Sequence, residues 1–246
     1  MFRVVKLASL AFVLIAFSAV PLAKAQTVVT GGTGIANAYP FGNYPEGQYA
    51  AGSQYQQIYS SADFSGPVTI TGIAFASTST STPGANVYNF NIGLGTTSST
   101  PANPSSTFAG NGTTTQVFSG PLTAPLTATG NFDLTIPLTT PFSYNPSQGN
   151  LLLDVVLNSN TTGTTTYFVS GNANDVGRVY QAGGIGLATA AGNSGLETEF
   201  IAIAVPEPST SGSIAMGSML LLASSWKKQR AKGQGQSCAK THTLRS

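Results

Sequence analysis

Apolar residues recur at every second position in several short runs of this 246-residue chain, and this period of two is the strongest constraint on its fold. The clearest run consists of Tyr88, Phe90, Ile92 and Leu94. Residues 132–138 show the same alternation. Successive side chains of a strand point to opposite faces, so each run predicts a strand with one buried face. No segment shows a helical apolar stripe opposite charged residues.

Further signals place these strands in one all-β domain. Residues 151–157 are almost continuously apolar, which predicts a central strand, and strands are also expected near 116–119, 165–170, 178–181 and 197–203. Val68 and Ile70 have the opposite parity to Ile73 and Phe75, so Gly72 is predicted to form a β-bulge. Turn residues separate the runs. We expect a single jelly-roll-like β-sandwich over 26–204.

Pro137 interrupts the alternating run at 132–138. Proline cannot donate a hydrogen bond to a neighbouring strand, so we expect this strand to lie at a sheet edge or to contain a bulge.

Charge is concentrated at the two ends of the chain. Residues 26–205 contain seven acidic residues and one base, Arg178, which gives a formal charge of −6. Without a basic patch this body has no means of neutralising phosphates, so nucleic acid is not expected as a partner. The hydrophobic fraction of 41% argues against a disordered chain.

The first 25 residues have the pattern of a secretory signal peptide. Arg3 and Lys6 precede an apolar run over residues 7–20, and Ala23 and Ala25 fit the small-x-small pattern that signal peptidase cleaves. We expect a signal helix, cleavage after Ala25 and export. An uncleaved anchor is the alternative, although the apolar run is short for a membrane span.

The C-terminal segment over 205–230 has three successive parts. The first is the motif Val205, Pro206, Glu207 and Pro208. Residues 209–226 are small and apolar and predict a single, weakly spanning membrane helix. A basic cluster of Lys227, Lys228 and Arg230 then predicts that the following residues stay on the cytoplasmic side. Residues 231–246 predict a basic, disordered tail.

This arrangement resembles the PEP-CTERM sorting domain of exported bacterial proteins. The resemblance implies that a membrane exosortase processes the chain near the motif. The chain would pass through an inner-membrane intermediate and reach the cell surface or the extracellular space of a bacterium that secretes exopolysaccharide. One departure from the family pattern is the tail after the basic cluster, and a plain C-terminal membrane anchor is the alternative.

The body also resembles, more loosely, β-sandwich domains of exported PEP-CTERM proteins. The matching residues lie at 54–59, 64–70, 141–142 and 149–154. Convergent sandwich composition is the alternative. The resemblance implies no catalytic residue.

Cysteine and histidine are each present once, as Cys238 and His242 in the tail. The body therefore has no disulfide, no thiol or imidazole for nucleophilic catalysis and no ligands for a common zinc site. We expect neither a metal nor a cofactor.

Tyrosines near the start of the body are candidate sugar contacts, because aromatic faces can stack on sugar rings. These are Tyr44, Tyr49, Tyr55 and Tyr59, which alternate with asparagine and glutamine. The alternative is that they pack against the sandwich.

Two smaller groups of polar residues suggest other chemistry. Asn172, Asn174 and Asp175 could supply oxygen ligands to Ca²⁺ or could form a hydrogen-bonded turn. Glu197 and Glu199 share a strand face, as a glycosidase pair would, and as two solvated acids also would.

We therefore expect a non-enzymatic structural protein of the cell surface or extracellular matrix. A carbohydrate-binding module attached to exopolysaccharide is the alternative, and a glycosidase is third.

Overall fold

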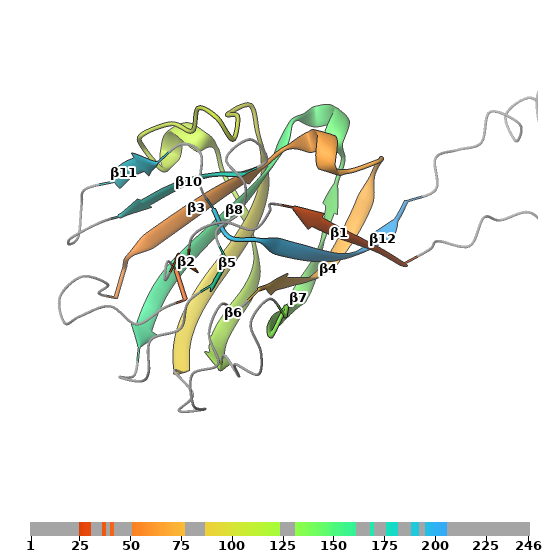
Figure 1. Cartoon of the computed structure of the whole chain (residues 1–246). Helices are drawn as coiled ribbons and strands as arrows, with labels where there is room; N and C mark the ends of the chain where they lie inside the picture. Colours follow the sequence, from red (N-terminus) through yellow and green to blue (C-terminus); the bar gives the residue numbers. More distant parts are fainter. Residues whose placement is uncertain are drawn as a thin grey trace, which may run out of the picture. The chain divides into compact units, whose positions relative to one another are not determined.

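The computed structural model describes residues 25–30, 36–37, 40–41, 51–76, 87–123, 131–160, 168–169, 176–181, 188–191 and 195–205 (Figure 1). The strands are β1 (Ala25–Thr30), β2 (Ala36–Asn37), β3 (Gln54–Tyr59), β4 (Val68–Phe75), β5 (Val87–Thr97), β6 (Thr115–Thr123), β7 (Leu134–Tyr144), β8 (Asn150–Asn160), β9 (Phe168–Val169), β10 (Val176–Gln181), β11 (Ala188–Ala191) and β12 (Thr198–Ala204). Three single-turn 3₁₀ helices are η1 (Ser61–Asp63), η2 (Ala109–Asn111) and η3 (Pro146–Gln148).

Two antiparallel sheets pack face to face as a β-sandwich, which confirms the predicted all-β class. The four-stranded sheet has the order β1-β12-β4-β7, and the six-stranded sheet has the order β11-β10-β3-β8-β5-β6. Strands β2 and β9 form a separate short pair. The chain divides into two compact units, 1–205 and 206–246. The predicted signal helix and membrane helix lie outside the described residues.

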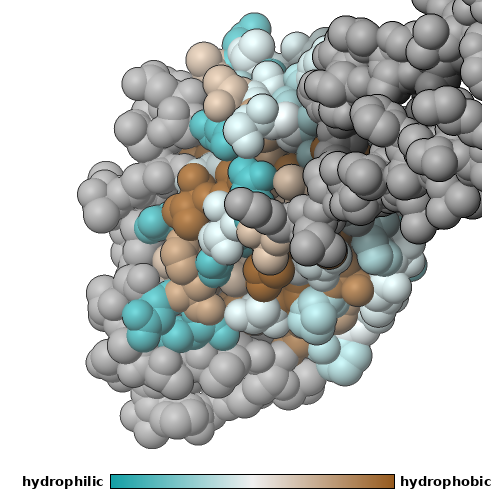
Figure 2. Space-filling view, turned by 90° about the vertical axis from the view of Figure 1, so that its right-hand side faces the viewer, coloured by the Kyte–Doolittle hydropathy of each residue, from teal (hydrophilic) through white to brown (hydrophobic). Residues whose placement is uncertain are grey.

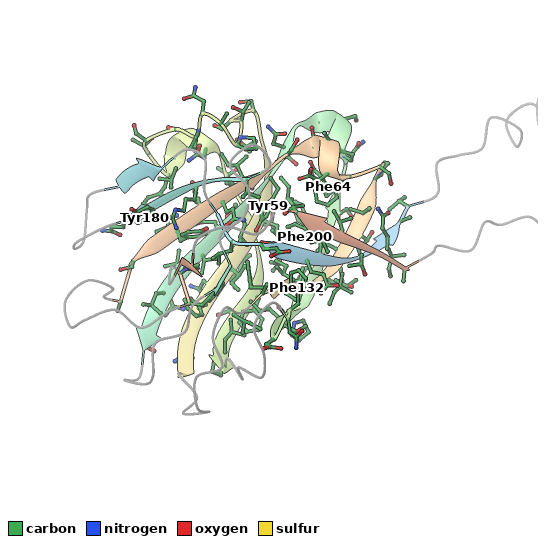
Figure 3. All side chains as sticks on the ribbon, in the orientation of Figure 1. Tyr59, Phe64, Phe132, Tyr180 and Phe200 are labelled. Carbon is green, nitrogen blue, oxygen red and sulfur yellow. The ribbon has the colours of Figure 1, made fainter. Side chains whose placement is uncertain are left out.

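The core lies between the two sheets and follows the alternation seen in the sequence. On β5 the side chains of Phe90, Ile92 and Leu94 are buried, and on β7 those of Leu134 and Ile136 are buried. Figure 3 shows aromatic rings from different strands meeting in this layer.

The rings of this aromatic group stack edge to face or at a tilt. Phe200 lies 4.8 Å from Tyr59 and 5.6 Å from Phe64, measured between ring centroids. Phe64 lies 4.8 Å from Tyr144. Because these residues come from both sheets, the aromatic group links the two layers.

The predicted irregularities at Gly72 and Pro137 occur at one place. The register between β4 and β7 shifts between Ile70 and Gly72, and Gly72 pairs with Pro137. Against β12 the register of β4 shifts by one residue at the same point, and this lets Ile70 and Ile73 both point into the core although their parity differs. Strand β7 is an edge of its sheet, where a proline costs no ladder hydrogen bond.

The outer face of the six-stranded sheet is partly covered by residues 98–112, at the upper left of Figure 1. The side-chain amide of Asn150 donates to the carbonyl oxygen of Ser99 at 2.8 Å. That of Asn111 donates to Gln56 Oε1 at 3.1 Å. This cover explains why Leu152 on the outer face of β8 is fully buried. Strand β8 is central, as its continuous apolar sequence predicts.

Candidate functional site

The predicted processing residues lie at the borders of the sandwich. Ala25 is the first residue of β1 and pairs with Ile203 of β12. Val205 follows β12 directly, is 44% exposed, and its backbone N–H donates to the carbonyl oxygen of Pro67 at 2.9 Å. The other predicted processing residues lie outside the described residues: Ala23, Pro206, Glu207, Pro208, Lys227, Lys228 and Arg230.

Two of the four candidate sugar-contact tyrosines are buried on β3. Tyr55 and Tyr59 each have 0% of their surface exposed. A ring without exposed surface cannot stack on a sugar, so the packing alternative describes these two residues and the sugar-contact interpretation is corrected for them. Tyr44 and Tyr49 lie outside the described residues.

Tyr55 and Tyr59 belong to a buried hydrogen-bond network centred on Gln57. The Tyr55 hydroxyl donates to Gln57 Oε1, which also accepts from the backbone N–H of Leu196 at 2.7 Å. Gln57 Nε2 donates to the Leu196 carbonyl at 2.8 Å. Tyr59 and Thr198 share a hydroxyl–hydroxyl bond of 2.9 Å. The network joins β3 of one sheet to the segment that enters β12 of the other.

Burial determines how these phenols ionise. It raises the pKa of both Tyr55 and Tyr59 well above the ordinary tyrosine value, because a buried phenolate would lose its hydration. Both hydroxyls therefore stay protonated at physiological pH and serve as hydrogen-bonding groups. The alternating pattern could not reveal this network, because it contains polar side chains that point into the core.

A ladder of uncharged polar side chains crosses the outer face of the six-stranded sheet. Ser119 Oγ donates to Asn91 Oδ1 at 2.8 Å, and Asn91 Nδ2 contacts Asn158 Oδ1 at 3.3 Å. Asn89 Nδ2 donates to Ser159 Oγ at 2.8 Å. Strands β6, β5 and β8 thus hold amide and hydroxyl groups in fixed positions at the surface. We call these five residues the polar ladder.

Asp154 lies on the same sheet, between the polar ladder and residues 98–112, which we call the covering segment. Gln54 Nε2 donates to its two carboxylate oxygens at 2.8 and 3.0 Å. Burial raises the pKa of Asp154, and hydrogen bonds from the side chains of Gln54, Gln56 and Thr114 partly oppose this rise. The carboxylate is therefore held by neighbouring amides.

The remaining predicted groups do not assemble a reaction centre among the described residues. Glu197 and Glu199 are half-buried on either side of buried Thr198. Glu199 of β12 pairs with Val29 of β1. Asn172, Asn174 and Asp175 lie outside the described residues. Within the described ranges, no three histidine, cysteine, aspartate or glutamate residues gather where a metal ion could bind. No helix in this part of the chain has the length and apolarity needed to cross a membrane.

The covering segment borders an open, polar hollow. It is lined by Ser98, Ser99, Thr100, Asn103, Pro104, Ser105 and Ser106. Serine and threonine predominate in this lining, and it has no aromatic or charged side chain. The hollow therefore offers hydrogen bonds without an apolar platform.

Comparison with protein families, with curated proteins and with solved structures finds no match to this chain.

Proposed function

We propose that the sandwich is the exported body of a non-enzymatic structural protein of the bacterial cell surface or extracellular matrix. In this proposal signal peptidase cleaves after Ala25, and an exosortase processes the chain near Pro206. The apolar segment over 209–226 serves as a temporary membrane anchor. Residues 26–204 then remain as the mature body.

The observation that carries this proposal is the position of the first and last strands. Strand β1 begins at Ala25 and β12 ends at Ala204, so almost all of the pairing between these two strands lies between the two proposed cleavage points. Cleavage after Ala25 removes only the pair Ala25–Ile203 and leaves Gln26 to Thr30 bonded to β12. Processing at both ends therefore leaves the sandwich intact. The pairing also brings both ends of the body to one end of the same sheet.

A jelly-roll topology is the finer form of the proposed fold. A jelly roll is a long antiparallel hairpin wrapped into two sheets, so its strands pair first with last and second with second-last. Four ladders support this arrangement: β1 pairs with β12, β3 with β8, β4 with β7, and β5 with β6. Strand β10 extends one sheet beyond this set.

The test replaces Pro206, Glu207 and Pro208 together by alanine in a host that contains an exosortase. We expect the variant to accumulate in the membrane fraction, whereas the original chain reaches the surface. The matched control is Pro141→Ala, at an exposed proline of β7. Surface delivery of the triple variant at the original level would refute exosortase sorting.

The polar ladder favours a second candidate function, attachment to exopolysaccharide. Amides and hydroxyls fixed across three strands can exchange hydrogen bonds with sugar hydroxyls. Replacing Asn91 by alanine removes the central member, because Asn91 bonds to both Ser119 and Asn158. We expect weaker co-sedimentation with the native polysaccharide than for the control Asn131→Ala, an exposed asparagine away from the ladder. Equal binding by both variants would exclude the polar ladder as the surface that binds the polysaccharide.

A further inference from the structure

The exposed apolar side chains of β12 form one row that runs to the end of the sandwich. Ile201, Ile203 and Val205 have 39%, 40% and 44% of their surface exposed, whereas Phe200 and Ala202 are buried. Because side chains alternate along a strand, the three exposed residues point to the same outer face. Apolar side chains that are exposed together are typical of a contact surface. We call these three residues the apolar row.

The strand partners of Ile201 and Ile203 are all uncharged. They are Thr27 and Ala25 on β1 and Gly72 and Thr69 on β4. Glu199 is the next residue of β12 on this face, and it is half-buried and lies on the far side of Ile201 from Val205. The apolar row and its strand partners therefore carry no charge that would have to be desolvated in a contact.

The sequence places the predicted membrane segment close to this end of the sandwich. Only three residues, 206–208, separate Val205 from residues 209–226. Three extended residues span at most about 11 Å, and the headgroup layer on each side of a bilayer is about 5–8 Å thick. The backbone N–H of Val205 is bonded to the carbonyl oxygen of Pro67, so this tether begins at a fixed point of the sheet. An anchored body therefore has the end of β12 at the bilayer surface.

The beginning of the sandwich lies at the same end. Ala25 pairs with Ile203, and Figure 1 shows the start of β1 beside the end of β12. The apolar run of the predicted signal helix, residues 7–20, precedes β1 by a few residues. Before cleavage, both predicted membrane segments are therefore joined to one end of one sheet.

We infer that the apolar row is a membrane-docking surface, on which the body rests against the bilayer while it is anchored. Docking in this form rests on the proposed function, because it needs the membrane anchor over 209–226. Three aliphatic side chains bind a bilayer weakly by themselves, but the short tether keeps them at a high effective concentration beside it. The formal charge of −6 disfavours anionic lipids, so a zwitterionic bilayer is the expected partner.

The test measures how strongly lipids quench a fluorophore on the full chain in nanodiscs of phosphatidylcholine that carries bromine near the headgroup. Cys238 is first replaced by serine, and a small fluorophore is attached to one new cysteine. Thr27→Cys lies beside Ile201 on β1 and leaves the apolar row intact, whereas Ser106→Cys lies on the covering segment of the other sheet. We expect strong quenching for Thr27→Cys and little for Ser106→Cys. Equal quenching would overturn the docking surface, because the body would then turn no particular face to the bilayer.

A third label separates this result from a failure of the proposed function. Ala223→Cys lies within the predicted membrane segment, so its label is quenched whenever that segment is in the bilayer. Quenching for Ala223→Cys without quenching for Thr27→Cys would overturn the docking surface alone. No quenching for Ala223→Cys would refute the anchor and, with it, the docking that needs the anchor.

Paired substitutions test whether the apolar row itself makes the contact. On the Thr27→Cys chain, Ile201→Ser together with Ile203→Ser should lower the quenching roughly twofold or more, because apolar area is lost from the contact. The matched control, Ile201→Val with Ile203→Val, keeps the row apolar and should leave the quenching nearly unchanged. Unchanged quenching in the serine variant would show that the tether alone holds the body, and would overturn the docking surface. If the serine variant does not fold, the comparison of Thr27→Cys with Ser106→Cys still decides.

Discussion

The outer faces of the two sheets differ in how they are covered. The six-stranded sheet carries the polar ladder and the segment 98–112. The four-stranded sheet has no comparable cover among the described residues, and large apolar side chains are exposed on it: Val29 at 48% and Ile203 at 40%. Figure 2 shows apolar surface among polar residues on the side of the molecule that faces right in Figure 1. One face is partly covered by the chain itself and carries polar side chains, whereas the other exposes large apolar side chains among the described residues.

The edge strand β1 reinforces this difference. Natural edge strands are usually protected by lysine, proline or a bulge. Between Ala25 and Thr30 the sequence has none of these side chains, and the ladder from β1 to β12 runs without a register shift. We therefore expect the four-stranded sheet to be the face through which this protein associates.

The first prediction compares one glycine on each sheet. A Cβ atom at Gly177 would lie 1.9 Å from the carbonyl oxygen of Pro101 in the covering segment. Backbone cannot move away locally, so Gly177→Ala should lower the free energy of unfolding by about 3 kcal/mol or more. At Gly72 the nearest atom is the side-chain Cδ1 of Ile201 at 3.1 Å, and this partly exposed side chain can shift. Gly72→Ala should cost less than about 1 kcal/mol.

Urea unfolding of the two alanine variants provides this measurement. Equal losses would contradict the account, because they would show that the covering segment is no more rigid than the open face.

The second prediction concerns the network that joins the sheets. Gln57→Leu removes the partners of the Leu196 backbone groups and of the Tyr55 hydroxyl, which stay buried. Unsatisfied buried groups cost about 1–3 kcal/mol each, with partial relaxation, so we expect a loss of about 2–3 kcal/mol. The control is Gln148→Leu at an exposed site. An equal fall in Tm for both variants would show that the network does not stabilise the fold.

The alternating runs predicted β5 and β7 because each has one face in the core and follows the period of two, and the continuous apolar run over 151–157 predicted β8 as a central strand. The sequence also located the bulge at Gly72, where the parity of apolar residues changes. It predicted neither β1 nor β11 as a strand. These short strands depend on pairing with β10 and β12 and not on their own pattern.

The candidate site was less predictable for a physical reason. On β3 both faces are covered, one by the core and one by the segment 98–112, so Gln56 and Gln57 are buried as fully as their apolar neighbours. The sequence of β3 therefore does not alternate between apolar and polar residues. Its tyrosines, placed between amide side chains, look like an exposed sugar-binding surface in the sequence.

The third prediction tests the open face through association. The carboxylates of the body become protonated as the pH falls toward 4, so repulsion weakens and association should increase. Val29→Lys should reduce this association several-fold in light scattering of the surface-extracted protein, because it protects the edge strand. The control Thr115→Lys on β6 adds the same charge to an exposed site of the six-stranded sheet, and we expect it to reduce association less. A monodisperse monomer at every pH would argue against the open face as a contact surface.

The smallest effect is expected at Asp154 on the closed face. Burial raises its pKa in the folded chain above the unfolded value of about 3.9, so the folded state holds the proton more tightly. Its contribution to stability is therefore complete below the unfolded pKa and is lost as the pH rises through the raised, folded pKa. Asp154→Asn should flatten the fall in Tm between these two pKa values. An unchanged pH profile would show that the surrounding amides fully offset burial.

Intact mass analysis of the protein extracted from the cell surface tests the central claim most directly. The bounds of β1 and β12 allow the removal of both ends without loss of the β1–β12 pairing beyond Ala25. The account predicts a single species that begins at Gln26 and ends close to Pro206. A surface species that retains the residues from Lys227 to Ser246 would contradict it.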